Sequence, residues 1–235
     1  HRVGRWIISL ESNNDLRVKL DREALWESII SLHPHLECVR EIEQLEISLA
    51  TVAPSADDSG IKRRNMERIK TLRHDALLQA KQLFDQGIEH KDQGRYDQAL
   101  EMFHQSLEIT HRTIGSNTKE VANTLGNIAL IHKDQGRYDQ ALEMLDQSLE
   151  ITHRTIGSNT KEVANTLANI AIIHINQGRY DQALEMLDQS LEIYRRTIGS
   201  NTNEVANTLH NIAIIHMDQG RYDQALEMLD QSLEI

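Results

Sequence analysis

Apolar side chains recur at three- and four-residue intervals along most of the chain, and this spacing predicts amphipathic helices. Residues 121–134 place their apolar positions on one stripe of a helix with about 3.6 residues per turn; these positions are Val121, Leu125, Ile128, Ala129 and His132. A second stripe of the same period follows Gly136, and it consists of Tyr138, Ala141, Leu142, Leu145, Ser148 and Leu149. Each such stretch therefore predicts a pair of helices joined by a short turn.

Polar residues and glycines mark the ends of these helices. Asn117 followed by Glu120 has the spacing of a capping box, in which side chains satisfy the free amides of the first turn. Gly136 is expected to end the first helix in the left-handed conformation. Gly115 and Gly157 are expected to end the second helices. The hairpin is thus bounded on both sides.

The hairpin pattern repeats with a period of 42 residues. Residues 163–204 match residues 121–162 at 35 of 42 positions, and residues 205–235 continue the pattern. Residues 91–120 match residues 133–162 except at Phe103 and His104. A fixed period of this length is typical of solenoids, in which each unit buries its apolar face against its neighbours. We predict four repeats, at about residues 79–120, 121–162, 163–204 and, truncated, 205–235.

Small side chains recur where the two helices of a hairpin must approach closely. Larger side chains are not expected to fit there without overpacking. These positions are Ala129, Ala171 and Ala213 in the first helices and Ala141, Ala183 and Ala225 in the second.

Residues 1–60 do not follow the period and are predicted to form a separate N-terminal helical segment. Residues 21–32 and 34–52 read as two amphipathic helices, with Pro34 placed in a first turn. Residues 53–60, APSADDSG, have the composition of a linker. From Ile61 the apolar pattern runs unbroken into the first repeat, which predicts one long helix. We therefore divide the chain into residues 1–60, which could cap the repeats, and residues 61–235.

Composition favours an all-α protein and narrows its partners. Two prolines and 4% aromatic residues suit helices better than sheets. The net charge is −11, and residues 79–235 carry −10 of it, so nucleic acid is not an expected partner. The single cysteine, Cys38, cannot form an internal disulfide. Apolar runs such as Ile128–Ile131 are far shorter than the roughly 20 residues that span a bilayer, so no membrane association is expected.

A basic cluster precedes the repeats, between Lys62 and Arg73. It resembles a nuclear signal or a patch for an acidic partner, but acidic residues interrupt it. We interpret it as a solvated helix face.

The sequence contains no motif that indicates catalysis, a cofactor or a metal. It has no nucleotide-binding glycine loop, paired-cysteine motif or nucleophile elbow. One histidine recurs in each unit, at His90, His132, His174 and His216. Ligands of one ion must converge within about 2.1 Å of it, whereas equivalent residues of stacked hairpins are on the order of 10 Å apart or more. We therefore expect a non-enzyme without cofactor or metal, in which these histidines serve packing.

The repeats resemble the tetratricopeptide repeat. The resemblance rests on Gly-Arg-Tyr in each turn, preceded by Gly87 or an alanine and followed by an alanine four residues after the arginine. The long period and the segments TLGNIA, TLANIA and TLHNIA resemble the repeats of kinesin light chains in particular. The sequence departs from the family pattern at Ser106, Ser148, Ser190 and Ser232, where alanine is usual, and in lacking a proline after the second helix. The resemblance covers about residues 76–235 and implies a right-handed superhelical solenoid of antiparallel helix pairs.

The first helix of each repeat has a second face that core packing does not explain. Repeats differ mostly on this face, while outer positions of the second helices are constant. In proteins that this chain resembles, first helices line a concave groove, and asparagines matching Asn127, Asn169 and Asn211 bind the backbone of an extended peptide. Asparagine offers both a donor and an acceptor to peptide groups. The candidate peptide-binding residues are Asn123, Asn127, Leu130, Lys133, Asp134, Asn165, Asn169, Ile172, Ile175, Asn176, Asn207, His210, Asn211, Ile214, Met217 and Asp218.

The predicted function is a cytoplasmic scaffold that binds an extended, partly apolar peptide of a protein partner. Free drift of exposed positions after duplication would also produce variation on this face. The alternative function is self-assembly, because an apolar end of the solenoid could stack end to end on another copy to give a homo-oligomer.

Overall fold

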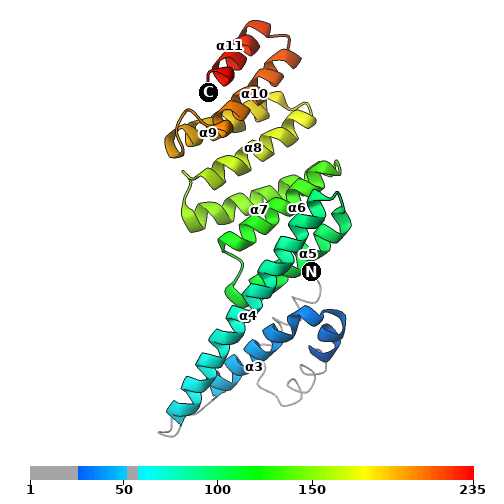
Figure 1. The fold of residues 1–235 in the computed structure, drawn as a ribbon, viewed down its shortest axis with the longest axis vertical. Coiled ribbons are helices and arrows are strands. Elements are labelled where there is room, and N and C mark those ends of the chain that lie inside the picture. The colour runs from blue at the N-terminus through cyan, green and yellow to red at the C-terminus, as the bar shows by residue number, and fades with distance from the viewer. Residues whose placement is uncertain (1–25, 52–57) are drawn as a thin grey trace. The chain divides into compact units, whose positions relative to one another are not determined.

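The computed structural model describes residues 26–51 and 58–235, and every regular element in those ranges is helical (Figure 1). Residues 21–25 of the helix predicted for residues 21–32, and residues 53–57 of the predicted linker, lie outside the described residues. Chain packing divides the protein into two units, residues 1–79 and 80–235. The elements are η1 (Pro34–Leu36), α3 (Glu37–Thr51), α4 (Asp58–Asp92), α5 (Tyr96–Ile114), α6 (Lys119–Asp134), α7 (Tyr138–Ile156), α8 (Lys161–Asn176), α9 (Tyr180–Thr197), α10 (Asn203–Asp218) and α11 (Tyr222–Leu233).

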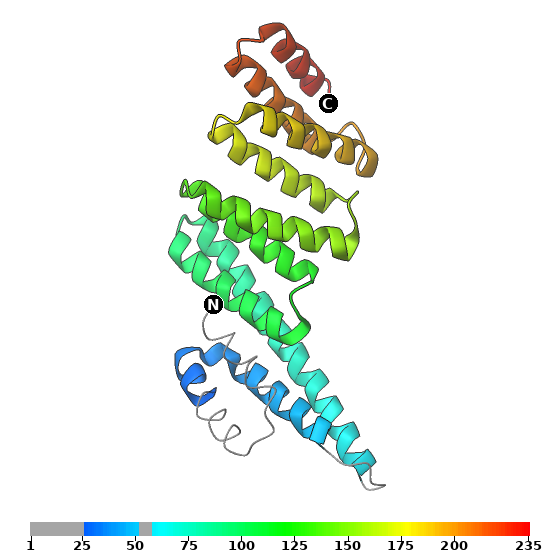
Figure 2. The same ribbon diagram turned by 180° about the vertical axis from the view of Figure 1, so that it is seen from behind.

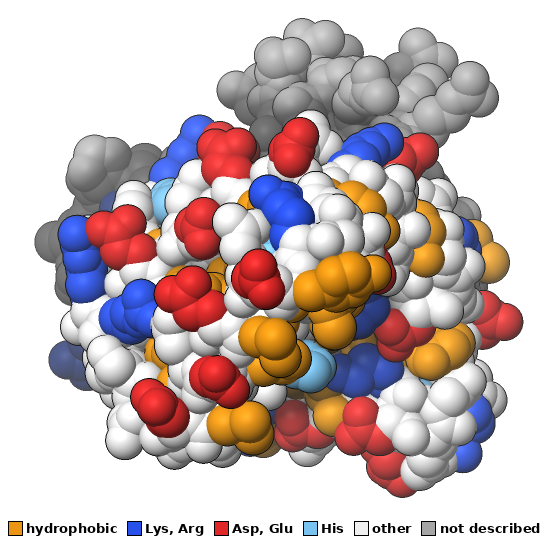
Figure 3. Space-filling model, turned by 90° about the horizontal axis from the view of Figure 1, so that it is seen from above, with side chains coloured by type: hydrophobic (Ala, Val, Ile, Leu, Met, Phe, Trp, Pro, Cys, Tyr) orange, Lys and Arg blue, Asp and Glu red, His pale blue; other side chains and the backbone are white. Residues whose placement is uncertain are grey.

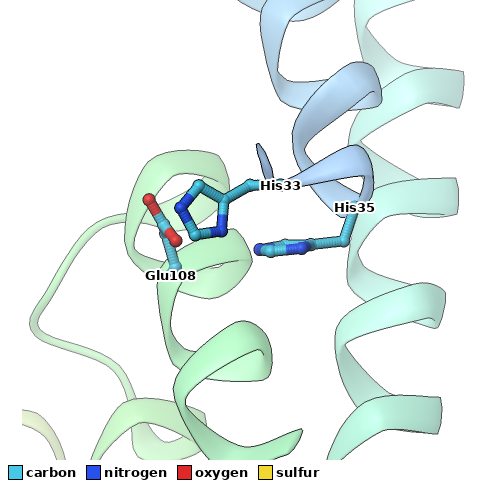
Figure 4. Close-up of side chains that lie close together, drawn as sticks. All are labelled: His33, His35 and Glu108. Atoms are coloured by element: carbon cyan, nitrogen blue, oxygen red, sulfur yellow. The ribbon is translucent and has the colours of Figure 1, made fainter. Parts of the chain in front are cut away.

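The first unit contains residues 26–32, which are helical, followed by η1, α3 and the first part of α4. Pro34 is the first residue of η1. Proline has no amide hydrogen, and no helical hydrogen bond is lost because amides of the first turn have no partner within the helix. The rings of His33 and His35 on either side of it meet edge to face, with centroids 5.6 Å apart (Figure 4). The predicted division at residue 60 and the capping role of this unit stay predictions.

The basic cluster of α4 is partly engaged in ion pairs with α3. Arg68 Nη2 lies 2.9 Å from Glu41 Oε1, and Arg73 Nη2 lies 2.5 Å from Glu46 Oε1. Both arginines remain about half exposed. The cluster is therefore a solvated face, as interpreted from sequence, that also joins two helices of the unit.

The second unit is a series of helix hairpins stacked in chain order, which both views of the ribbon show (Figures 1 and 2). The pairs α6–α7, α8–α9 and α10–α11 form the hairpins, and the end of α4 packs on α5. Each second helix also contacts the next first helix, and α8 contacts both α6 and α10. None of the described helices is long and apolar enough to cross a membrane. The predicted all-α solenoid of antiparallel helix pairs is confirmed.

The turn inside each hairpin is closed by glycine and two backbone hydrogen bonds. Gly136 has φ +71°. Its N–H donates to the Lys133 carbonyl at 2.9 Å, and the Arg137 N–H donates to the His132 carbonyl at 2.8 Å. This pair of bonds is the Schellman motif, which satisfies carbonyls that the helix end leaves free. The same bonds recur after Gly94, Gly178 and Gly220, so the predicted role of Gly136 is confirmed.

The N-terminal cap of the first helices differs from the prediction by one residue. The cap of α6 is Thr118, whose Oγ1 accepts a hydrogen bond from the Val121 N–H at 3.4 Å. Thr160 and Thr202 cap α8 and α10 in the same way. The capping box predicted at Asn117 and Glu120 is wrong, because the helix begins at Lys119 and the threonine hydroxyl reaches the third helical amide.

The interior of each hairpin has small residues at the helix contact and one polar bond across it. Ala129 and Ala141 are fully buried, as predicted. Ser148 Oγ donates to the Ala122 carbonyl of the first helix at 2.8 Å. The equivalent bonds are Ser106 to Ala80, Ser190 to Ala164 and Ser232 to Ala206. These serines, which depart from the usual alanine, therefore connect the two helices of every hairpin.

Candidate peptide-binding face of the first helices

The candidate site residues form one accessible face along α6, α8 and α10, which we call the ladder face. All sixteen predicted residues lie on these three helices, and none of them is buried. Their neighbours one residue away, such as Ile128 and Ile170, are buried in the core. Because α8 contacts α6 and α10, the three ladder-bearing helices are direct neighbours. The prediction that packing leaves this side of the first helices accessible agrees with the burial pattern.

Asparagines form two columns on the ladder face. The inner column, Asn127, Asn169 and Asn211, is half-buried, and the outer column, Asn123, Asn165 and Asn207, is exposed. A half-buried amide is held by its surroundings and still reaches solvent. That combination suits a group that must form hydrogen bonds with an incoming backbone.

The first inner asparagine already has internal partners. Lys91 Nζ, at the end of α4, donates to Asn127 Oδ1 at 2.9 Å. Asn127 Nδ2 donates in turn to the Asn123 carbonyl at 3.0 Å. Across the described part of the chain, the side-chain amides of Asn169 and Asn211 have no hydrogen bond. The three inner asparagines are therefore not equivalent.

An outer asparagine of the third repeat is also engaged. Tyr194 on α9 is buried, and its hydroxyl donates to Asn165 Oδ1 at 2.5 Å. Burial raises the pKa of this phenol above its usual range. The equivalent Thr152 instead donates to the Ser148 carbonyl of its own helix at 2.7 Å. Aligning the repeats shows that Tyr194 replaces Thr152, but the sequence does not connect Tyr194 to the ladder face.

The charged residues of the face are paired within the protein. Lys133 Nζ lies 3.3 Å from Asp134 Oδ1. Asp218 Oδ2 accepts a hydrogen bond from the Tyr180 hydroxyl of the preceding repeat at 3.1 Å. That hydrogen bond to a carboxylate raises the pKa of Tyr180. From sequence, the equivalent Tyr138 is assigned to the apolar stripe of a second helix, so the role of Tyr180 at this face was missed.

Apolar residues lie between the polar positions. Leu130, Ile172, Ile175 and Ile214 are half-buried, and Met217 is 39% exposed. Such side chains offer contact area beside the asparagines without closing the face. The surface is therefore mixed, with amides for a backbone and aliphatic groups for side chains.

A separate cavity lies at the joint of the last two repeats and contains none of the ladder-face residues. It encloses about 360 Å³ between α9, α10 and α11, with Asp188, Arg195 and His216 among mostly apolar side chains. The view from above shows hydrophobic side chains gathered on this face of the molecule, with histidine and basic side chains among them (Figure 3). Burial and the nearby Arg221 lower the pKa of His216 below its usual value, and Asp188 opposes them. The cavity therefore favours a neutral imidazole at the repeat joint.

Three of the recurring histidines, His132, His174 and His216, lie at repeat joints, each beside a residue of the preceding repeat. Burial is the main cause that lowers the pKa of His132, His174 and His216. Their Nδ1 atoms are buried and have no hydrogen-bond partner in the described ranges. No group of three potential ligands forms around any of them among the described residues. Their environment is that of packing residues.

Comparison with known proteins places these features in a family. The tetratricopeptide repeat model matches residues 76–153 and 162–235, which is more than half of the chain. No curated protein matches the chain in sequence.

Solved structures share the fold at low sequence identity. BtubC (BKLC) from P. vanneervenii superposes with a TM-score of 0.61 and 17% identity, covering 85% of this chain and 88% of that chain. A kinesin light chain-like protein of Podosopora anserina with nearly identical TPR-like repeats gives TM-scores of 0.56 and 0.55 in two crystal structures. Those structures are 18% and 17% identical, and they cover 86% and 84% of this chain and 95% of theirs. At these identities the likeness concerns the fold.

Proposed function

Because the chain belongs to the tetratricopeptide repeat family, whose repeats generally mediate protein–protein interaction, we propose that its second unit is a scaffold that holds an extended, partly apolar peptide on the ladder face. The observation that carries the proposal is the pair of half-buried amides of Asn169 and Asn211, which have no hydrogen bond within the described residues. Each offers a donor and an acceptor to the backbone of a bound segment. We place this activity in the cytoplasm.

The spacing of the first helices suits an extended backbone. Packed helices lie about 8–10 Å apart, and α8 and α10 contact each other. An extended chain rises about 3.3 Å per residue. We call each inner asparagine, Asn127, Asn169 or Asn211, a rung. One rung therefore faces about three peptide residues, and the aliphatic side chains of Ile172, Ile175 and Ile214 contact the peptide side chains between rungs.

The test is a selection of displayed 12-residue peptides on the protein, followed by affinity measurements with the tightest peptide made synthetically. Replacing Asn127, Asn169 and Asn211 together by alanine is expected to weaken binding by at least tenfold, since each lost hydrogen bond is worth about 0.5–1.5 kcal/mol. The matched control replaces the exposed loop asparagines Asn117, Asn159 and Asn201, one in each connection. Equal affinities of the two triple variants would refute the ladder.

Self-association is the second candidate, and the exposed apolar side chains of α11 favour it. Leu226 is 59% exposed, whereas its equivalents Leu142 and Leu184 are half-buried. Leu233 is 84% exposed, whereas its equivalent Leu149 is half-buried and Leu191 is buried. Light scattering over a range of concentrations tests this function. A molar mass that stays at 26.9 kDa at every concentration excludes it.

A further inference from the structure

The three inner asparagines of the ladder face differ in how many hydrogen bonds their side-chain amides already form within the protein. Asn127 uses its oxygen for Lys91 and its amide nitrogen for the Asn123 carbonyl. One acceptor lone pair and one donor hydrogen of its amide are therefore already in use, and only the remaining lone pair and hydrogen are left for a peptide. Asn169 and Asn211 have both functions available, as far as the described residues show.

The difference follows from one position of the repeat, through its orientation in two units and its residue type in the third. Lys91 precedes Asn127 by 36 residues, and the same interval leads from Lys133 to Asn169 and from Ile175 to Asn211. Lys133 is turned to Asp134 instead, with its Nζ 3.3 Å from the carboxylate. Ile175 has no polar atom with which to donate. Only the first of these three residues reaches the asparagine of the following repeat.

The contact between Lys91 and Asn127 resists displacement by a neutral peptide. It is a partly buried hydrogen bond with a charged donor, and such bonds are stronger than bonds between neutral groups. A peptide amide that took its place would leave the ammonium group without that acceptor. A backbone segment therefore gains less at Asn127 than at a rung with no internal partner.

We propose that Lys91 is a specificity-determining residue that partly occupies the first rung, so that a bound peptide is held chiefly by Asn169 and Asn211 on α8 and α10. This inference rests on the proposed function and specifies which repeats carry it. The position of Lys91 sets where the peptide footprint ends. An aliphatic residue there, as at Ile175, opens the rung and lengthens the footprint by about three peptide residues.

The first experiment needs no peptide. The side-chain amide signals of Asn127, Asn169 and Asn211 are assigned by NMR in the free protein and in Lys91→Met, which carries the residue that the fourth repeat has at Met217. The Asn127 signals are expected to shift and to exchange faster with water in the variant, while the Asn211 signals stay in place. Unchanged Asn127 signals would overturn the Lys91 contact.

The second experiment measures the affinity of the selected, fluorescein-labelled peptide for single asparagine variants by fluorescence polarisation. In the parent protein, Asn127→Ala is expected to change the affinity less than twofold, and Asn169→Ala and Asn211→Ala to weaken it about tenfold each. Lys91→Met is expected to bind the peptide more tightly when it is extended from 12 to 15 residues. Adding Asn127→Ala to this variant is then expected to weaken the affinity about tenfold. Thermal melts by circular dichroism confirm that each variant is folded.

The outcomes separate the two ideas. Equal weakening by all three asparagine variants in the parent protein would overturn the role of Lys91 and leave the proposed function intact. Full affinity in all three variants would overturn the proposed function, while the amide signals of the free protein would still decide the Lys91 contact.

Discussion

A Cβ atom at Gly87 would lie 2.6 Å from Cε1 of Phe103, closer than side-chain carbons approach in proteins. Phe103 is fully buried and fills the space that the glycine leaves. The equivalent pairs in the following repeats are Ala129 with Leu145 and Ala171 with Leu187. A smaller residue on the first helix thus accompanies a larger one on the second, and the two substitutions compensate each other.

We predict that Gly87→Ala lowers the free energy of unfolding by about 1–3 kcal/mol through overpacking against Phe103. This direction is opposite to the usual gain of about 1 kcal/mol when alanine replaces glycine inside a helix. Urea unfolding followed by circular dichroism measures the change. The double variant Gly87→Ala/Phe103→Leu, which carries the pair of the next repeat, is expected to regain the loss. A single variant as stable as the parent would contradict the tight contact.

Ser190 provides a second test of the hairpin interior. Its hydroxyl is fully buried and donates to the Ala164 carbonyl at 2.9 Å. We expect Ser190→Ala to destabilise the protein by about 0.5–1.5 kcal/mol, the usual worth of one such bond. Gln189→Ala is the matched control, because Gln189 is exposed and its bond to Glu185 is 3.5 Å long. Similar urea midpoints for the two variants would show that the serine bond contributes nothing.

The position of the helix cap gives a prediction that separates two adjacent residues. Thr160 Oγ1 accepts the Val163 N–H at 3.3 Å, whereas Asn159 is exposed before the helix. Thr160→Ala is expected to cost about 1 kcal/mol, within the range for N-cap residues. Asn159→Ala is expected to cost less than 0.5 kcal/mol, as for most surface substitutions, which change stability by less than about that amount. The reverse order in chemical unfolding would restore the capping box that the sequence first suggested.

Features that repeat locally along the sequence were predictable. The apolar spacing around Ile128 and Leu145 gave the two helices of a hairpin, and the left-handed turn followed from Gly136, because these signals depend on neighbours within a few residues. The cap was displaced because the sequence places two good capping residues, Asn117 and Thr118, side by side. Which of the two caps the helix depends on how Val121 packs in the core, and this is a tertiary effect.

Contacts between distant residues could not be predicted from the period. Lys91 reaches Asn127 over 36 positions, and Tyr194 reaches Asn165 over 29. Both contacts depend on the angle and offset between neighbouring helices. The number of residues between two positions does not determine this geometry. Comparing the repeats did show that positions 133, 175 and 194 vary, so it located the differences without assigning their partners.

The histidines predict how stability changes with pH. Burial is the first cause that lowers the pKa of each of five histidines: His104, His111, His132, His174 and His216. Since their pKa values in the unfolded chain are near 6.5, the unfolded chain binds more protons than the folded protein just below that pH. The contribution of these histidines to the free energy of unfolding is therefore constant above about pH 7. It decreases as the pH drops below 6.5.

The charges around the histidines at the repeat joints do not reverse the effect of burial. His174 faces Arg179, which disfavours a second positive charge, and Asp146, which favours it, and the net pKa is still lowered. His132 faces Arg137 and His104, and no carboxylate of the described residues opposes them. Burial raises the pKa of Asp146. Its contribution has the opposite sign, because protonation of Asp146 stabilises the folded protein.

We expect the urea midpoint to decrease as the pH is lowered from 7.5 to 5.5. The decrease is expected to be smaller in a variant with glutamine at His132, His174 and His216. Both proteins lose net negative charge as the pH drops, which by itself relieves self-repulsion, so their difference isolates the histidines. The Nδ1 atoms of all three lack a hydrogen-bond partner among the described residues, so a proton added there has no acceptor to stabilise it. Parallel midpoints for the two proteins across this range would mean that the repeat joints accept the charged imidazole without cost, and the packing role assigned to these histidines would then be wrong.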